Sequence, residues 1–145
     1  MAPIVSKIEI DRPPDQVFAY VTDAENIPKW QASAHATRIE REDPASGVTR
    51  AVINRQMGPR AVDHTIEVKM DDPPRSWTVR GVDGPIRPVV NGQVEPLDDG
   101  ARSRVTVELD PKGHGIGLLF SPLARRQMVR EMPGNMQRLK GLIEG

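Results

Sequence analysis

The stretch that decides the fold runs from Ser121 to Ile143 and reads SPLARRQMVREMPGNMQRLKGLI. Its apolar residues recur mostly at steps of three or four, as on one buried face of an amphipathic helix; they are Leu123, Met128, Met132, Met136, Leu139 and Ile143. Ser121 is a good N-cap, and Pro122 suits the first helical position. Pro133-Gly134 interrupts the pattern, and we expect a kink there. The sequence therefore predicts one long helix near its end.

Composition and length exclude several classes of protein. The 145 residues fit one domain, 1–145, of a size that buries a core. Twenty basic and twenty acidic residues cancel, so nothing favours nucleic acid or a polybasic membrane anchor. No apolar run approaches the roughly 18 residues of a membrane span, and no signal peptide is recognised at Met1. The lack of cysteine excludes disulfides and thiolate sites. We expect a cytoplasmic protein, as a monomer or weak dimer.

Short strands dominate the chain before the long helix. Ile4–Ile10 alternates as a half-buried strand, and two short helical segments follow it, Gln16–Thr22 capped by Asp15 and Ala24–Trp30. Turn signals then separate six further strands: Ala34–Arg41, Val48–Gln56, Val62–Met70, Ser76–Val82, Val89–Glu95 and Arg102–Leu109. This order predicts an α+β fold, in which a seven-stranded antiparallel sheet wraps around the C-terminal helix. Six positions should be buried in it: Ile8, Ile66, Val68, Val105, Val107 and Leu139.

Three stretches resemble a known superfamily. Residues 8–23, IEIDRPPDQVFAYVTD, together with Ile27-Pro28-Lys29-Trp30, resemble the opening of START-related, Bet v 1-like (SRPBCC) proteins. Glu95–Val107 resembles their late hairpin, and Leu139–Glu144 resembles the end of their long helix. The resemblance implies a helix-grip fold with a deep apolar cavity between sheet and helix, for which we expect roughly 300–1,000 Å³. Members bind lipids, sterols, polyketides or plant hormones, and some of the polyketide cyclase/dehydrase-like group close aromatic rings.

His64 is the candidate catalytic residue. It shares its strand face with Val62, Ile66 and Val68, so its side chain is expected to point into the cavity. A neutral imidazole there can act as a general acid or base, or polarise a ligand carbonyl. Desolvation should keep it neutral at pH 7. The alternative is a core histidine bonded to a backbone carbonyl or to water.

Further candidate contacts are distributed over several elements, and each has a structural alternative. The ligand-binding set comprises Trp30, His35, Ile39, His64, Ile66, Val68, Asn91, Gln93, Met128, Met132 and Met136. His35 shares strand parity with Ile39 and is either a cavity or a rim residue. Asn91 and Gln93 share one strand face, which is either inward or solvated. The methionines, four apart on the helix, form an adaptable apolar wall or plain core packing. Trp30 is a wedge or a stacking surface, and His114 lies on a glycine-flanked lid or connection.

Three functions remain open. The first is binding of an apolar, polyketide- or lipid-like small molecule for transport or sequestration, and this is the one that we favour. The second is a polyketide cyclase or dehydratase in which His64 is the acid/base and the cavity shape steers ring closure. The third is a protein-interaction module. Three histidines on separate segments make a poor zinc site, so we expect no metal and no cofactor.

Overall fold

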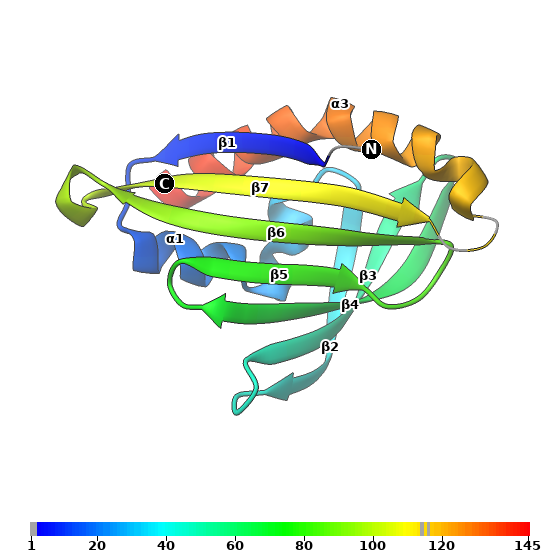
Figure 1. The fold of residues 1–145 in the computed structure, drawn as a ribbon, viewed down its shortest axis with the longest axis horizontal. Helices are drawn as coiled ribbons and strands as arrows, with labels where there is room; N and C mark the ends of the chain where they lie inside the picture. Colours follow the sequence, from blue (N-terminus) through cyan, green and yellow to red (C-terminus); the bar gives the residue numbers. More distant parts are fainter. Residues whose placement is uncertain (1–2, 114, 116) are drawn as a thin grey trace.

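Seven strands form one antiparallel sheet in the part of the chain that the computed structural model describes, residues 3–113, 115 and 117–145. The order is β1-β7-β6-β5-β4-β3-β2, and the predicted sheet is confirmed (Figure 1). The strands are β1 (Ile4–Ile10), β2 (Ala34–Asp43), β3 (Val48–Met57), β4 (Arg60–Asp72), β5 (Ser76–Gly81), β6 (Ile86–Leu97) and β7 (Arg102–Gly113). Hairpins join β2 to β7 in sequence, and β1 adds to the outer side of β7, with Ile8 opposite Val105.

The strands β6 and β7 are longer than the sequence predicted. Their predicted bounds exclude Pro88 and Pro111, neither of which can donate to a strand ladder. In the structure these two prolines lie opposite each other, and pairing continues to Ile86 and Gly113. The missing N–H groups of Pro88 and Pro111 therefore fall at one place in the register, and the third proline of the hairpin, Pro96, lies next to its turn, opposite Ser103.

Two short helices and a 3-10 turn come between β1 and β2, and a long helix ends the chain. They are α1 (Pro14–Val21), η1 (Ala24–Asn26), α2 (Ile27–Trp30) and α3 (Gly117–Glu144). The predicted cap at Asp15 is wrong, because α1 begins at Pro14 after an N-cap at Pro13. Asp15 instead accepts a hydrogen bond from the N–H of Gln16, at 2.9 Å. None of the described helices is long and apolar enough to cross a membrane.

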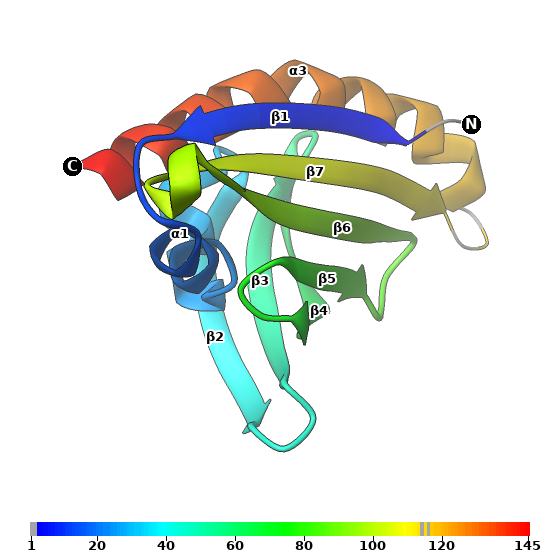
Figure 2. The same cartoon turned by 60° about the vertical axis from the view of Figure 1, so that its left-hand side comes forward.

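The helix α3 begins earlier than predicted. It is one continuous helix through Pro133-Gly134, where a kink was expected. It starts at Gly117, so the expected start at Ser121-Pro122 lies inside the helix. Leu118 and Leu119, which favour helix, extend it ahead of the proline. It continues through Pro133 to Glu144 as one arc over the sheet (Figure 2). Pro133 and its neighbour Gly134 are exposed, so the carbonyl that the proline leaves unpaired is on the water side of the arc.

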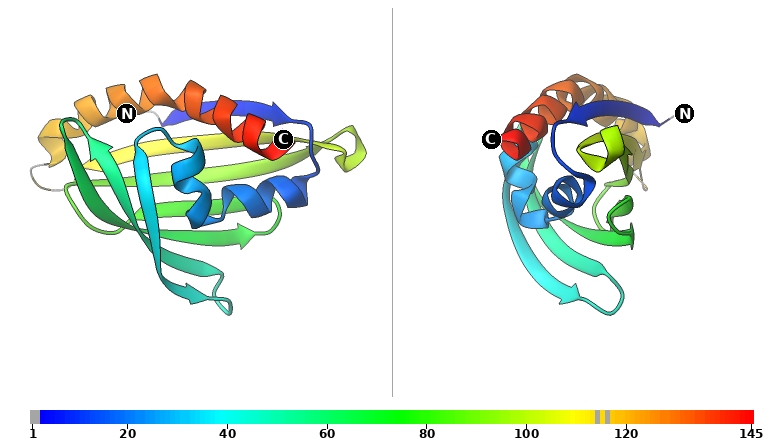
Figure 3. Two further views of the ribbon diagram at one scale, coloured as in Figure 1. Left: turned by 180° about the vertical axis from the view of Figure 1, so that it is seen from behind. Right: turned by 90° about the vertical axis from the view of Figure 1, so that its left-hand side faces the viewer.

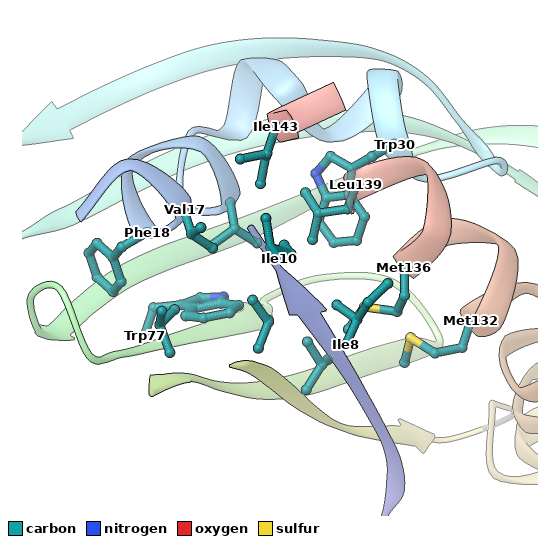
Figure 4. Close-up of a cluster of buried hydrophobic side chains, with 14 of the residues drawn as sticks. Ile8, Ile10, Val17, Phe18, Trp30, Trp77, Met132, Met136, Leu139 and Ile143 are labelled. Carbon is teal, nitrogen blue, oxygen red and sulfur yellow. The ribbon is translucent and has the colours of Figure 1, made fainter. Parts of the chain in front are cut away.

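The main core lies between α1, α3, β1 and β7. Figure 4 shows Phe18, Trp77, Ile10 and Leu139 packed within it. All six positions predicted to be buried are buried: Ile8, Ile66, Val68, Val105, Val107 and Leu139. The amphipathic spacing of the long helix thus correctly identified the packed face from Met128 to Ile143. It was wrong at Leu123, which is 63% exposed, because the step of five residues to Met128 turns it to another side of the helix.

A second buried cluster lies under the other half of the sheet. It comprises Ala24, Ile27, Ala34, Ala51, Ile53, Ile66 and Val68. Figure 3 shows the sheet curling from α3 towards this half, with α1 and α2 at one end of the curl. The curl separates the two clusters and positions the cavity between them.

Candidate functional site

A cavity of about 150 Å³ lies between the sheet and α3. Trp30, Trp77 and Met132 from the main core line it, as do Ile66 and Val68 from the second cluster. The volume is about half the lower limit of roughly 300 Å³ that we expected. The expectation was too large because the Trp77 indole and the α3 methionines extend into the space.

Six of the predicted contact residues line this cavity. They are Trp30, His64, Ile66, Val68, Met128 and Met132, contributed by α2, β4 and α3. Met136 is instead only 2% exposed and belongs to the main core. Of the three methionines, Met128 and Met132 therefore line the cavity, and Met136 packs in the core, because α3 packs against β1 and β7.

His35 and Ile39 are outside the cavity. His35 is exposed, and its Nε2 lies 3.1 Å from Gln56 Oε1. The strand β2 has a bulge between Ala34 and Ala36: these residues are two apart in β2, but their partners Arg55 and Asn54 are adjacent in β3. Such a bulge reverses the alternation of side chains, so the parity that placed His35 inward does not hold. Ile39 packs against the second cluster without reaching the cavity wall.

Asn91 and Gln93 face solvent, so neither lines the cavity. Both are exposed on β6, whereas Gly92 and Val94 between and after them are buried. The inward face must hold Gly92, because the Trp77 indole lies against it and a Cβ at that position would overlap three indole atoms. The position of one aromatic ring thus determines which face of β6 is inward.

Arg55 on β3 is the central polar group of the cavity, and the sequence analysis did not identify it. Its Nε–H donates to His64 Nε2 at 3.2 Å. One terminal nitrogen donates to Ser33 Oγ at 2.7 Å and the other to Gln31 Oε1 at 2.7 Å. Burial lowers the pKa of Arg55 to about 10, while the negative charge of Glu131 acts to raise it. The guanidinium therefore remains a cation at neutral pH.

The cation in the cavity retains unused hydrogen-bonding capacity. A guanidinium carries five N–H groups, and the three bonds to His64, Ser33 and Gln31 leave two without a partner among the described residues. Arg55 is absent from the ion pairs formed between the described residues. A buried cation is ordinarily stabilised by a paired anion. Two N–H groups of a buried cation are therefore available to a further hydrogen-bond acceptor.

His64 is held as a neutral hydrogen-bond donor. It is 6% exposed, and its Nε2 accepts from Arg55, so the proton of the neutral ring is on Nδ1. Burial first, and the charge of Arg55 second, lower its pKa to about 4. Its buried Nδ1 has no partner among the described residues. Protonation is thus unfavourable, and the ring is better suited to polarising an oxygen than to accepting a proton.

The helix α3 contributes a second polar group of residues to the cavity. Gln127, Glu131 and Asn135 line it at successive turns. Gln127 donates to Glu131 Oε1 at 3.2 Å, and Asn135 Oδ1 accepts from the N–H of Ala32 at 3.0 Å. The polar end of the cavity is therefore built where α3 passes the α2–β2 connection, and the walls from β5 to β7 are apolar.

Arg55 had a signal in the sequence. Ala51, Ile53 and Arg55 follow one another at a spacing of two, so the arginine shares a strand face with two small or apolar residues. Both of those residues have no exposed surface. The partners Gln31 and Ser33 lie in a connection whose geometry no spacing rule predicts.

Two further expectations concern the histidines. The lid or connection at His114 lies outside the described residues. Within 3–113, 115 and 117–145, no three or more His, Asp or Glu side chains gather as a metal site would require.

Replacing the exposed His35 by alanine should change the free energy of unfolding by less than about 0.5 kcal/mol. Urea unfolding followed by circular dichroism measures it. A loss of more than about 1 kcal/mol would contradict the solvent-facing bulge, because only a packed or buried side chain costs that much to remove.

The comparisons with known proteins agree on a family and a fold. The family model of polyketide cyclase / dehydrase and lipid transport proteins matches residues 1–144. An aromatase/cyclase from a Streptomyces species has a similar structure, with a TM-score of 0.80 and 13% identity over 98% of this chain and 93% of that one. A START superfamily protein from Mycobacterium smegmatis gives 0.79 and 13%, over 99% and 98% of the two chains.

A protein from Thermus thermophilus is also similar, with a TM-score of 0.74 and 17% identity over 97% of this chain and 96% of that one. The search of curated protein sequences gave no match. At these identities the structures show the fold alone, whereas the family model covers nearly every residue. The chain therefore belongs to the polyketide cyclase/dehydrase and lipid transport family, and its fold is that of the START-related, Bet v 1-like proteins.

Proposed function

We propose that the protein binds a small, mainly apolar molecule whose carbonyl or anionic oxygen accepts hydrogen bonds from Arg55. One observation carries the proposal: a guanidinium with two unused N–H groups and no carboxylate partner among the described residues lines an otherwise largely apolar cavity. The cavity walls would bury the apolar part of the guest, while Arg55 fixes its orientation. Transport or sequestration of a polyketide- or lipid-like compound is the role that this arrangement fits best.

A second candidate is a cyclase or dehydratase reaction in the same cavity. The named activity of the Streptomyces neighbour, aromatase/cyclase, and the family description favour it. With a pKa of about 4 and Nε2 engaged by Arg55, His64 is a weak base at neutral pH. In such a reaction His64 and Arg55 would polarise a carbonyl, and the cavity would hold the substrate in a folded shape.

Two probes of equal ring size test the binding proposal. Naphthoate carries a carboxylate and methylnaphthalene does not, so their difference measures the contribution of the oxygen. Both tryptophans of the chain, Trp30 and Trp77, line the cavity, and their fluorescence reports its occupancy. Wild-type protein should bind naphthoate at least about tenfold more tightly than methylnaphthalene, since a hydrogen bond to a charged group contributes about 1.5–3 kcal/mol.

The variant Arg55→Met should abolish the preference for naphthoate and leave methylnaphthalene binding nearly unchanged. Arg80→Met is the matched control, because Arg80 is exposed on β5 and its removal leaves the cavity intact. Circular dichroism and the urea midpoint establish that both variants fold. The proposal fails if neither probe binds, or if wild-type protein does not distinguish them.

A further inference from the structure

The first turns of α3 carry an exposed apolar surface. Leu118, Leu119 and Leu123 are 65%, 76% and 63% exposed, well above the exposure of an ordinary leucine in a packed helix. Figure 1 shows this part of α3, in gold, at the end of the molecule opposite the β6–β7 turn. A cluster of three such side chains at the edge of a protein marks a surface of contact.

Positive charge accompanies these leucines. The segment from Lys112 to Arg130 holds Lys112, Arg125, Arg126 and Arg130 and contains no acidic residue, although acidic and basic residues balance over the whole chain. Arg126 and Arg130 are exposed and follow Leu119 and Leu123 by seven residues each. At 100° per residue all four therefore lie on one side of the helix. Two acidic residues flank the segment: Asp110, whose carboxylate lies 3.9 Å from the Lys112 ammonium, and Glu131, which lines the cavity.

The opposite side of the same turns belongs to the cavity. Ala124, Gln127, Met128 and Glu131 line it. The outer face of these turns carries leucines and arginines, and their inner face lines the cavity. A partner bound to the outer face would therefore lie within about one helix diameter of a molecule in the cavity.

We propose that this outer face of α3 docks the protein on an anionic lipid bilayer surface. Leucines that insert at the headgroup boundary, flanked by arginines that meet lipid phosphates, are the chemistry of an interfacial helix. A bilayer accepts protruding leucines without a matching groove. A second copy of the chain is disfavoured, because a twofold contact through this face would bring two sets of arginines of like charge into one interface that holds no acidic residue of this face.

Flotation with two kinds of vesicle tests the proposal. Vesicles of phosphatidylglycerol and phosphatidylcholine in equal parts should bind the protein at least about tenfold more tightly than vesicles of phosphatidylcholine alone. Two double variants address the two components of the face: Leu119→Ser with Leu123→Ser, and Arg126→Gln with Arg130→Gln. Each should weaken binding to the anionic vesicles by about tenfold or more.

The controls separate this surface from the cavity and from self-association. Leu142→Ser removes another exposed leucine, 43% exposed at the far end of α3, and should leave vesicle binding unchanged. The leucine double variant should keep its naphthoate affinity, so the docking surface and the cavity proposal stand or fall separately. The proposal is overturned if anionic vesicles do not bind, if both vesicle types bind equally, or if gel filtration shows a dimer that the leucine variant loses.

Discussion

Lowering the pH from 7 to 4 should cost the wild-type protein roughly 3 kcal/mol of stability that a His64→Gln variant does not lose. The pKa of His64 is about 4 in the folded protein, against 6.5 for a free histidine, and the difference gives this magnitude. Because the side chain is 6% exposed, solvent screening does little to reduce it.

The sign follows from where the proton binds. Below about pH 6.5 the unfolded chain takes up a proton on this imidazole, whereas the folded protein does not until about pH 4. The stabilisation is therefore complete above pH 6.5, is lost progressively as the pH falls, and changes no further below pH 4. Carboxylates that titrate in the same range act on both proteins, so the difference between wild type and variant isolates His64.

Urea unfolding at a series of pH values measures this difference. His35→Gln is the matched control, because the exposed His35 lies outside the cavity, and it should follow the wild-type curve. Nuclear magnetic resonance gives a second reading on unmutated protein: the His64 ring should stay neutral, with its proton on Nδ1, down to pH 5. Parallel stability curves for wild type and His64→Gln would show that burial and the charge of Arg55 do not lower the pKa of His64.

The fold was predictable because the spacing of apolar residues within each strand or helix shows which of its faces is buried. Alternation in Ile4–Ile10 and in β4 identified strands and their buried faces, and the spacing of Met132, Leu139 and Ile143 identified the packed side of α3. These patterns survive because a sheet or helix buries one face along its whole length. The ends of elements were less predictable, since opposed prolines and an early helix start depend on partners distant in the sequence.

The site was only partly predictable. Helical periodicity correctly predicted that Met128 and Met132 line the cavity, whereas strand parity failed for His35 because a bulge in β2 interrupts the alternation. Arg55 was missed because a charged residue on an inner strand face contradicts the usual rule of burial. Its partners Gln31 and Ser33 come from a short connection, and only the assembled sheet brings them to the guanidinium.

Gly92→Ala should destabilise the protein by about 3 kcal/mol, with a fall of roughly 10 °C in melting temperature for a domain of this size. Gly92 on β6 is paired with Trp77 on β5, and the indole lies directly against the glycine. A methyl group there would overlap Cζ2, Cε2 and Cη2 of the ring. The ring has little freedom to retreat, because Phe18 meets it edge-on with centroids 6.1 Å apart and Trp77 is 3% exposed.

The open direction for the indole is into the cavity, which Trp77 lines. Gly92→Ala should therefore also weaken methylnaphthalene binding, because the displaced ring would take up part of a cavity of only about 150 Å³. Thermal unfolding and the fluorescence titration measure the two effects on the same preparation. Gly141→Ala on α3 is the matched control: apart from the nearby backbone of α3 itself, no atom lies within 4 Å of the added methyl group, so the change should stabilise the helix by about 0.5–1 kcal/mol.

A double-mutant cycle assigns the cost of the substitution to the ring. In a Trp77→Leu background the smaller side chain leaves room for a methyl group, so adding Gly92→Ala should cost less than about 1 kcal/mol. The interaction energy between the two positions would then account for most of the roughly 3 kcal/mol. If Gly92→Ala is equally costly with leucine at position 77, backbone conformation and not the indole requires the glycine. If Gly92→Ala is harmless in the wild type, the ring does not rest on β6, and the inner face of that strand must be assigned anew.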